Sequence, residues 1–214
     1  MGYMVNLAVE GRLAVVIGGG QVAARKLQDL LAAGARVVVF APNACERVIA
    51  LAEEKRIQLH RRPYAKADLA GAFLAVGATG DQEVNARVAG DAASMGVLVN
   101  VVDCPAFCTF TVPATVSRGD LTIAIGTEGR CPALAGILRD ELDERYGEEY
   151  AALVDLFADL RKTMIALAWD GGRIRETFTE LYRNGVAEFI ANGERQPLND
   201  FLQSRLGAAF PLPQ

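Results

Sequence analysis

The sequence predicts an α/β protein in which a Rossmann-type parallel sheet is followed by a small α+β segment and a C-terminal helical region. Short apolar runs rich in β-branched residues alternate with helical patterns over the first half of the 214-residue chain, as they do in βαβ folds. Three consecutive glycines directly follow the first of these runs. The last third of the chain contains amphipathic helical patterns without strand patterns between them.

The first strand and helix are predicted by residues 13–26, LAVVIGGGQVAARK. The pattern Gly18-x-Gly20-x-x-Ala23, with Gly19 between the first two glycines, is a dinucleotide-binding fingerprint. The first glycine makes a tight turn, the second lets the backbone approach a pyrophosphate, and the small third residue lets helix and strand pack closely. Free N–H groups and the helix dipole favour phosphate at the helix start. The stretch therefore predicts a nucleotide site, although a tight turn in any α/β protein can look the same.

The following segments continue the alternation. A helix over residues 21–33 ends at Gly34, and the uninterrupted apolar run over residues 36–41 is typical of a parallel strand covered on both faces. We then expect a helix over 44–55, strands over 57–61 and 72–78, a helix over 82–95 and a strand over 97–102.

The second half of the chain predicts a different organisation. Residues 110–113 and 121–126 look like strands that need not belong to the nucleotide-binding sheet. Residues 131–146 form an amphipathic helix with Pro132 near its first turn. Two further helices, over 148–168 and 174–191, are separated by Asp170-Gly171-Gly172, and the tail after Gly193 looks loosely structured. The predicted division is 1–112, 113–146 and 147–214.

The expected ribose ligand is missing. An acidic residue about 20 residues after the glycines usually binds the ribose hydroxyls, but this chain has Ala41, Pro42 and Asn43 there. We expect backbone groups and Asn43 to hold the ribose. Because no arginine cluster replaces the acid, we expect NAD rather than NADP.

A second predicted site follows the strand over residues 97–102. Ligands of open α/β sheets bind outside the carboxyl ends of the strands. Asp103 is placed where a catalytic carboxylate would face the cofactor. Thr79 follows the strand over 72–78 at the same edge and is a predicted cofactor contact. The alternative for Asp103 is an aspartate that caps a turn before Pro105.

Composition excludes several classes of function. The net charge of −4 argues against nonspecific nucleic-acid binding. No apolar run approaches the roughly 20 residues of a membrane helix, and no signal-peptide pattern is visible, so we expect a cytoplasmic protein. The four cysteines form no disulfide framework. Cys104-x-x-x-Cys108 could bind a transition metal, but free cysteines are commonly small hydrophobes, and we predict no resident metal.

Taken together, these segments resemble the precorrin-2 dehydrogenase family, which includes the dehydrogenase and ferrochelatase part of siroheme synthase. The resemblance covers most of residues 5–145, and the ordered combination of its segments is far more specific than any one of them. The segments are GGGQVAARK (18–26), GARVVVFAP (34–42), NARVA (85–89), VNVVD (99–103), FTVPA (110–114) and RGDLTIAIGTEGRCPALA (118–135).

The resemblance implies NAD-dependent oxidation of precorrin-2 to sirohydrochlorin, with Fe²⁺ inserted at the same site in some relatives. Asp103 corresponds to the family's aspartate after N-V-V, which is associated with both activities. The family's NAD contacts fall on Gln21, Val22, Pro42 and Asn43. The resemblance also implies a homodimer, with a Rossmann domain over 1–112, a dimerisation segment over 113–146 and a helical region over 147–214.

A tetrapyrrole substrate carries many carboxylates, so an acidic protein must gather positive groups locally. Arg118 and Arg130 lie in a resembling segment and could bind carboxylates in a bidentate manner, although each could equally be a solvated surface residue. Asn100 and Thr127 are the other predicted substrate contacts. His60 lies at a predicted edge of the Rossmann domain and is expected at the surface.

The chain departs from the family's pattern in two loops. Glu128 stands where the family usually has glycine, and Gly80 replaces an acid or amide. Both departures leave the balance of the two activities open. Two other functions remain: a module that senses NAD(H) without catalysis, and a dehydrogenase for another small substrate. The run over residues 100–138 argues against both.

Overall fold

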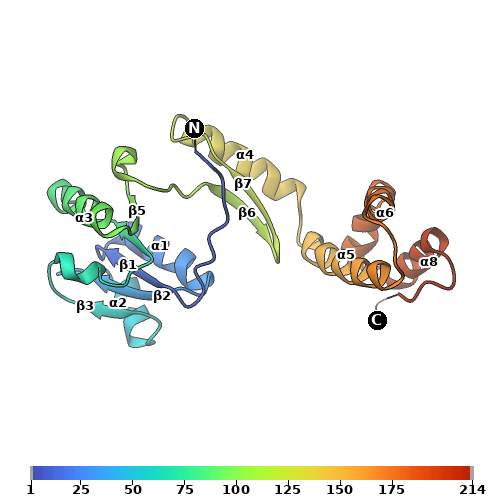
Figure 1. Cartoon of the computed structure of the whole chain (residues 1–214), viewed down its shortest axis with the longest axis horizontal. Coiled ribbons are helices and arrows are strands. Elements are labelled where there is room, and N and C mark those ends of the chain that lie inside the picture. The colour runs from blue at the N-terminus through green and yellow to red at the C-terminus, as the bar shows by residue number, and fades with distance from the viewer. Residues whose placement is uncertain (1, 213–214) are drawn as a thin grey trace. The chain divides into compact units, whose positions relative to one another are not determined.

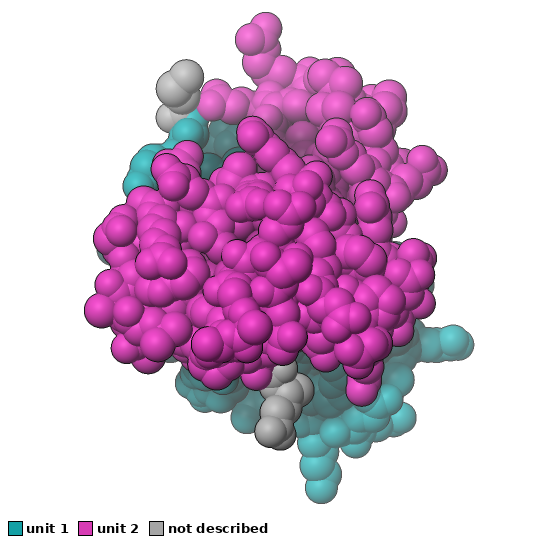
Figure 2. Space-filling model, turned by 90° about the vertical axis from the view of Figure 1, so that its right-hand side faces the viewer, with its two compact units in different colours: residues 1–112 teal, residues 113–214 magenta. Residues whose placement is uncertain are grey.

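The computed structural model describes residues 2–212, which divide into two compact units that meet in sequence at Val112 and Pro113 (Figure 2). The first unit contains a five-stranded sheet with helices, and the second contains a two-stranded sheet followed by helices (Figure 1). This confirms the predicted fold class. Over the described residues, none of the helices combines the length and the apolar content that a bilayer crossing requires.

The sheet of the first unit is parallel throughout, in the order β3-β2-β1-β4-β5. The register pairs Val16 of β1 with Val39 of β2 and with Val76 of β4. The chain therefore reverses its direction of travel across the sheet after β3, so that β1 and β4 are neighbours. The strands are β1 (Leu13–Ile17), β2 (Arg36–Phe40), β3 (Gln58–His60), β4 (Leu74–Gly77) and β5 (Leu98–Val101).

Helices cover both faces of this sheet. Alternate residues of β1, such as Val16, pack with α1 (Gln21–Ala32) and α2 (Glu46–Glu53). The residues between them, such as Val15, pack with α3 (Gln82–Met95). Burial on both faces explains why these strands are apolar runs without alternation.

One predicted strand of this region is wrong. Residues 110–113 are irregular, and the next strand begins at Ala114. The backbone carbonyl of Phe110 accepts a hydrogen bond from the side chain of Asn100, and Pro113 has no N–H group for a strand ladder. The apolar run is therefore a connection rather than a strand. Two short 3₁₀ turns, at Lys66–Leu69 and Pro105–Phe107, also lie in connections of the first unit.

The second unit begins with an antiparallel hairpin of β6 (Ala114–Arg118) and β7 (Leu121–Ile125), followed by α4 (Pro132–Arg145). Val116 of β6 is buried, whereas its neighbours Thr115 and Ser117 are exposed. This alternation is typical of an antiparallel sheet with one covered face.

The C-terminal part of the second unit consists of α5 (Glu149–Ala166), α6 (Gly171–Arg183), α7 (Val186–Ala191) and α8 (Arg195–Leu206). The single helix predicted over 174–191 is wrong, because Gly185 adopts a left-handed φ of 86° and separates α6 from α7. The prediction of a loose tail is also wrong. Leu198, Phe201, Leu202 and Leu206 form an apolar face of α8 that packs against the other helices.

Candidate active site

The glycine turn lies at the carboxyl edge of the parallel sheet, between β1 and α1. The N–H of Gly18 donates to the Phe40 carbonyl at the end of β2 (3.0 Å), and the Gly19 carbonyl accepts from the Cys45 N–H (2.8 Å). The N–H of Ala78, after β4, donates to Ile17 O (2.8 Å). The turn is thus fastened to the ends of both strands that neighbour β1.

The three glycines are required for different reasons. Gly18 has a φ of +121°, and a Cβ there would collide with the Ala78 carbonyl. A Cβ on Gly19 would lie 2.5 Å from the Asn43 carbonyl oxygen. A Cβ on Gly20 would meet no atom of the chain within 4 Å, so nothing in the fold requires glycine at this position. Open space beside a fingerprint glycine is what close approach of a pyrophosphate needs.

The start of α1 presents its backbone to the same space. Ala24 N–H donates to Gly20 O (3.0 Å), so the amides of Gln21 and Val22 precede the first bond of the helix and have no partner within it. Both residues are exposed, while Ala23 is fully buried against the sheet. This arrangement suits an anion at the helix N-terminus.

The segment after β2 supplies no charged ribose ligand. Ala41 is buried, and its N–H donates to His60 O (3.1 Å). Pro42 and Asn43 are exposed beside the glycine turn, so the Asn43 amide is free to face a ribose. His60 lies on the edge strand β3, where its ring stacks on Phe40 with a centroid distance of 4.8 Å.

Sequence reasoning missed Asn85, which organises the loop after β4. Its Nδ2 donates to Thr79 O (3.0 Å) and its Oδ1 accepts from Thr79 Oγ1 (2.9 Å). Asn85 is the one buried polar or charged side chain among residues 2–212. The available signal was an amide on a face of α3 that otherwise carries Val88, Ala89 and Ala92. The clamp fixes Thr79, a predicted cofactor contact, at the carboxyl edge.

We expect Asn85→Ala to destabilise the protein by about 1–3 kcal/mol, because it removes the hydrogen bonds that Asn85 makes with the partly buried Thr79. Chemical denaturation measures the change. Asn192→Ala, at an exposed helix end, should stay within about 0.5 kcal/mol of the wild type. Equal effects of the two substitutions would contradict a special role for Asn85.

Asp103 lies directly beyond β5 and has an unusual backbone. Its φ is +58°, a left-handed conformation that costs a non-glycine residue about 1–3 kcal/mol. Its side chain is exposed, and no hydrogen bond or ion pair to it is recorded among residues 2–212. The aspartate is therefore not a turn cap. It presents a free carboxylate at the edge where the glycine turn also lies.

The segment after Asp103 returns along the outer edge of β5. Thr109 N–H donates to Val99 O (2.8 Å), and Val99 N–H donates to Thr109 Oγ1 (2.7 Å). The Cys108 Sγ accepts from Val101 N–H (3.1 Å), and Asn100 Nδ2 donates to Phe110 O (3.1 Å). These contacts satisfy the free edge of β5. They give Cys108 and the predicted substrate contact Asn100 structural roles beside Asp103.

The Cys104 and Cys108 pair gains no further metal ligands. Over residues 2–212, no group of three or more His, Cys, Asp or Glu side chains is arranged to hold a metal ion. Both cysteines also pack against the sheet core, in agreement with their reading as small hydrophobes.

Lys26 and Asp68 are two of the groups in this unit whose pKa values are shifted. Burial lowers the pKa of Lys26 on α1, and the nearby Asp29 carboxylate opposes this fall. Burial acts to raise the pKa of Asp68, but hydrogen bonds from Arg62 (2.8 Å) and from the Ala65 N–H outweigh it, so the pKa is lowered. The ionised Asp68 thereby holds the connection after β3.

The loop between β7 and α4 carries two predicted substrate contacts of the second unit. Thr127 Oγ1 accepts from Cys131 N–H (3.4 Å), and Thr127 O accepts from Arg130 N–H (3.0 Å). Glu128 and Gly129 both have left-handed φ values, of 53° and 74°. Two successive left-handed residues explain why glycine is expected at both positions, and Glu128 departs from this at a cost in backbone strain.

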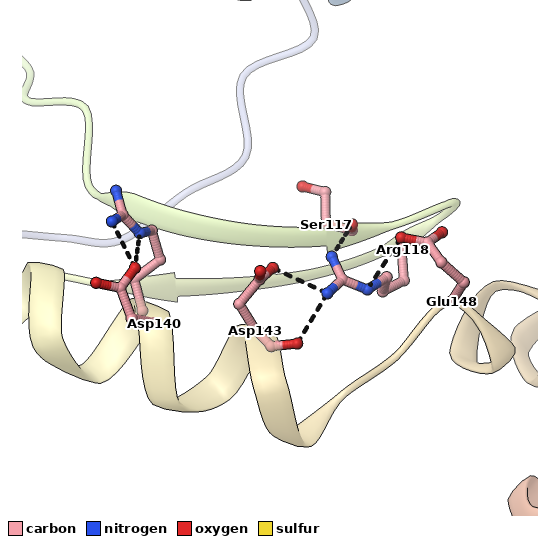
Figure 3. A network of polar contacts seen from close by, with 6 residues as sticks. Ser117, Arg118, Asp140, Asp143 and Glu148 are labelled. Atoms are coloured by element: carbon pink, nitrogen blue, oxygen red, sulfur yellow. Dashed lines mark hydrogen bonds and ion pairs between the residues drawn. The ribbon is translucent and has the colours of Figure 1, made fainter.

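Arg118 lies at the opposite end of the hairpin, because Arg118 pairs with Leu121 and Ala114 pairs with Ile125. Its guanidinium is largely buried and donates to Asp143 Oδ1 (2.8 Å) and Asp143 O (2.9 Å), with Glu148 3.4 Å from Nε (Figure 3). The structure therefore does not bring Arg118 together with Arg130. Arg118 instead links β6 to α4 through Asp143.

Comparisons with known proteins place the chain in a family. Residues 5–114 match the model of the family described as "Putative NAD(P)-binding". The chain is 36% identical over 203 residues to a siroheme synthase of Ectopseudomonas mendocina and 34% identical over 205 residues to one of Nitrosococcus oceani. Each match covers 95% of this chain but 44% of the relative, so the chain spans less than half the length of these siroheme synthases.

One solved structure matches over nearly the full length of both proteins. The structure of SirC, a precorrin-2 dehydrogenase, is superposed with a TM-score of 0.73 at 27% sequence identity, covering 95% of this chain and 98% of that one. The family match covers the whole parallel sheet, including the glycine turn and Asp103. The chain belongs to this NAD(P)-binding family, and it is similar to a precorrin-2 dehydrogenase along almost its entire length.

Proposed function

We propose that this protein oxidises precorrin-2 to sirohydrochlorin with NAD as the hydride acceptor. The observation that carries the proposal is the likeness to a precorrin-2 dehydrogenase over 98% of that protein's chain, combined with a glycine turn whose Gly20 faces open space. The free Asp103 carboxylate at the same sheet edge supplies a group for acid–base chemistry.

The residues around the glycine turn fit a dinucleotide. Gly20 and the amides of Gln21 and Val22 would hold the pyrophosphate, Pro42 and Asn43 would border the adenosine ribose, and Thr79 would lie beyond β4 along the same edge. When bound, NAD accepts a hydride at its nicotinamide ring. The protein contributes by fixing the relative positions of cofactor and substrate.

Asp103 would take up the proton that leaves with the hydride. Overall, the substrate loses a hydride and a proton, which leave as NADH and H⁺. The left-handed backbone at Asp103 keeps its carboxylate exposed rather than bonded within the loop, so it is available to a ring-bound proton of the substrate. Asn100 would hold this loop in place through Phe110 O.

Thr127 and Arg130 would contact the carboxylates of the substrate. The left-handed residues lie between them in a tight loop, in which Arg130 is exposed and Thr127 is partly exposed. A substrate contact of Arg118 stays a prediction. To bind a substrate carboxylate, its guanidinium would have to give up or share its hydrogen bond to Asp143.

The proposal is tested by anaerobic turnover of precorrin-2 with NAD, followed by absorbance. We expect NADH to form in proportion to sirohydrochlorin. Binding of NAD without oxidation would favour the sensing module instead. Fe²⁺ as a second substrate is tested in the same cuvette, because metal insertion would remove the sirohydrochlorin spectrum.

The four free cysteines are typical of a reducing compartment, and we propose a cytoplasmic location.

We also propose a homodimer formed through residues 113–146, with the helical region over 147–214 as a separate part of the same unit. On α4, Leu134 is 46% exposed and Ile137 is 63% exposed. Residues three apart share a helix face, so the two side chains form an uncovered apolar patch that a second copy would bury.

We expect Ile137→Glu to weaken this dimer at least about tenfold, because a charge would be buried at the contact. Analytical ultracentrifugation measures the change. Ile165→Glu is the control, since Ile165 is 50% exposed on α5 outside the proposed segment. A monomeric wild type, or equal weakening by both variants, would contradict the proposal.

A further inference from the structure

The helical part of the second unit contains a groove that the proposed chemistry does not use. It is an open groove of about 720 Å³, lined by α6 and by Arg161 of α5. Its lining includes three arginines and three apolar or aromatic side chains: Arg161, Arg175, Arg183, Ile174, Phe178 and Tyr182. All of these lie in the second unit, so the groove is complete within that unit.

The three arginines of the groove are exposed and have no side-chain partner recorded over residues 2–212. Other cations of the same helices are paired: Arg205 with Glu180 at 2.7 Å, and Lys162 with Asp159 at 2.8 Å. An adjoining hollow of about 530 Å³ shares Arg175 and Arg183 and adds Glu176 and the already paired Glu180. The groove therefore holds unneutralised positive charge in a chain of net charge −4.

The floor of the groove is apolar and fixed in place. Phe178 stacks on Phe157 with a centroid distance of 4.5 Å and an interplanar angle of 9°, and Ile174 is buried. Tyr182 is 45% exposed, and its hydroxyl is 3.2 Å from that of Tyr150. An apolar floor with arginines at its rim fits a flat apolar molecule that carries carboxylates.

The spacing of the arginines selects a large ligand. Arg175 and Arg183 are eight residues apart on α6, which corresponds to about 12 Å along the helix axis. A macrocycle with carboxylates around its rim can pair with both guanidinium groups at this spacing, whereas a single phosphate or a small dicarboxylate would require the two side chains to bend toward each other.

We infer that this groove binds a tetrapyrrole polycarboxylate, as a site separate from the one at the glycine turn and Asp103. The inference rests on the proposed function, which supplies a substrate and a product of this class. The arginines bind the carboxylates through charge-assisted hydrogen bonds, and the macrocycle lies against Phe178 and Tyr182.

The test uses the full chain and uroporphyrin III, a fluorescent octacarboxylate, without NAD or precorrin-2. Fluorescence titration should give two binding sites for each chain. The double variant Arg175→Gln/Arg183→Gln should retain one site and bind at the other about tenfold or more weakly. The control Arg36→Gln/Arg195→Gln removes the same charge from exposed positions outside the groove and should keep both sites within about twofold of the wild type.

Citrate identifies the class of ligand, because it carries carboxylates without a flat apolar body. We expect citrate to displace uroporphyrin from the groove only at concentrations about 100-fold higher. Equal competition, a single wild-type site that the Arg175→Gln/Arg183→Gln variant leaves unchanged, or equal losses in both double variants would each overturn the inference. Absence of precorrin-2 oxidation by the wild type would overturn the proposed function alone, since the titration does not depend on it.

Discussion

A methyl group at Gly20 is expected to abolish NAD binding while leaving the fold intact. The Cβ of Gly20→Ala would meet no atom of the chain within 4 Å, and the φ of −82° at this position suits alanine. Its free energy of unfolding should therefore stay within about 1 kcal/mol of the wild type. The same methyl group would occupy the space that the pyrophosphate needs, so the Kd for NAD should rise about 100-fold or more.

Gly18→Ala should give the opposite pattern. Here the Cβ would collide with the Ala78 carbonyl, and φ is +121°. Neither the backbone of β4 nor the turn can move without breaking the bonds that join them, so we expect a loss of stability greater than about 3 kcal/mol. Calorimetric NAD titration and denaturation, measured on both variants, separate the two effects. If Gly20→Ala bound NAD as well as the wild type, the cofactor could not lie over this turn.

The sequence was most informative where a periodic pattern and a steric requirement coincide. All five strands of the parallel sheet were predicted. Burial on both faces leaves apolar runs such as residues 36–41, whereas the edge strand β3 is mostly exposed and has no such run. The helix over 82–95 was predicted to the residue, because Asp81 caps its start with bonds to the N–H groups of Glu83 and Val84 and Gly96 ends it with a φ of 68°.

The errors arose where tertiary contacts outweigh local pattern. The apolar run at 110–113 resembles a strand, yet its carbonyl at Phe110 bonds a side chain of β5 instead of a ladder. Helix α8 carries several polar residues. Its apolar face packs against α5 to α7, and this packing could not be predicted from the α8 segment alone. The glycine that separates α6 from α7 could have been recognised from Asn184-Gly185, a common helix-ending pair.

The candidate site was only partly predictable for the same reason. Residue type and order identified the glycine turn and Asp103, but not the left-handed backbone that frees the Asp103 carboxylate. Asn85 was missed because a polar residue on a buried helix face has meaning only through the loop it clamps. For Arg118, a charge in a resembling segment could not be separated from an internal ion pair without the register of the hairpin.

The Asp103→Asn variant is expected to lose oxidation of precorrin-2 while keeping NAD affinity and stability. Asparagine has the same shape and tolerates a left-handed φ, so the loop should keep its conformation at the observed φ of +58°. The amide cannot accept the proton, and kcat should fall by about 10²–10⁴-fold. The Kd for NAD should change by less than about twofold, because the dinucleotide is held by the glycine turn.

Two further variants separate chemistry from charge and from strain. Asp81→Asn removes a carboxylate from the same sheet edge but preserves the helix cap, and it should retain near-normal turnover. Asp103→Gly relieves the left-handed strain and should raise the free energy of unfolding by up to about 1 kcal/mol, yet it should be as inactive as Asp103→Asn. Asp103→Gly would then lose activity although its stability rises. A purely structural role for Asp103 predicts instead that a variant which keeps its stability also keeps its activity. Near-normal turnover by Asp103→Asn would show that another group accepts the proton.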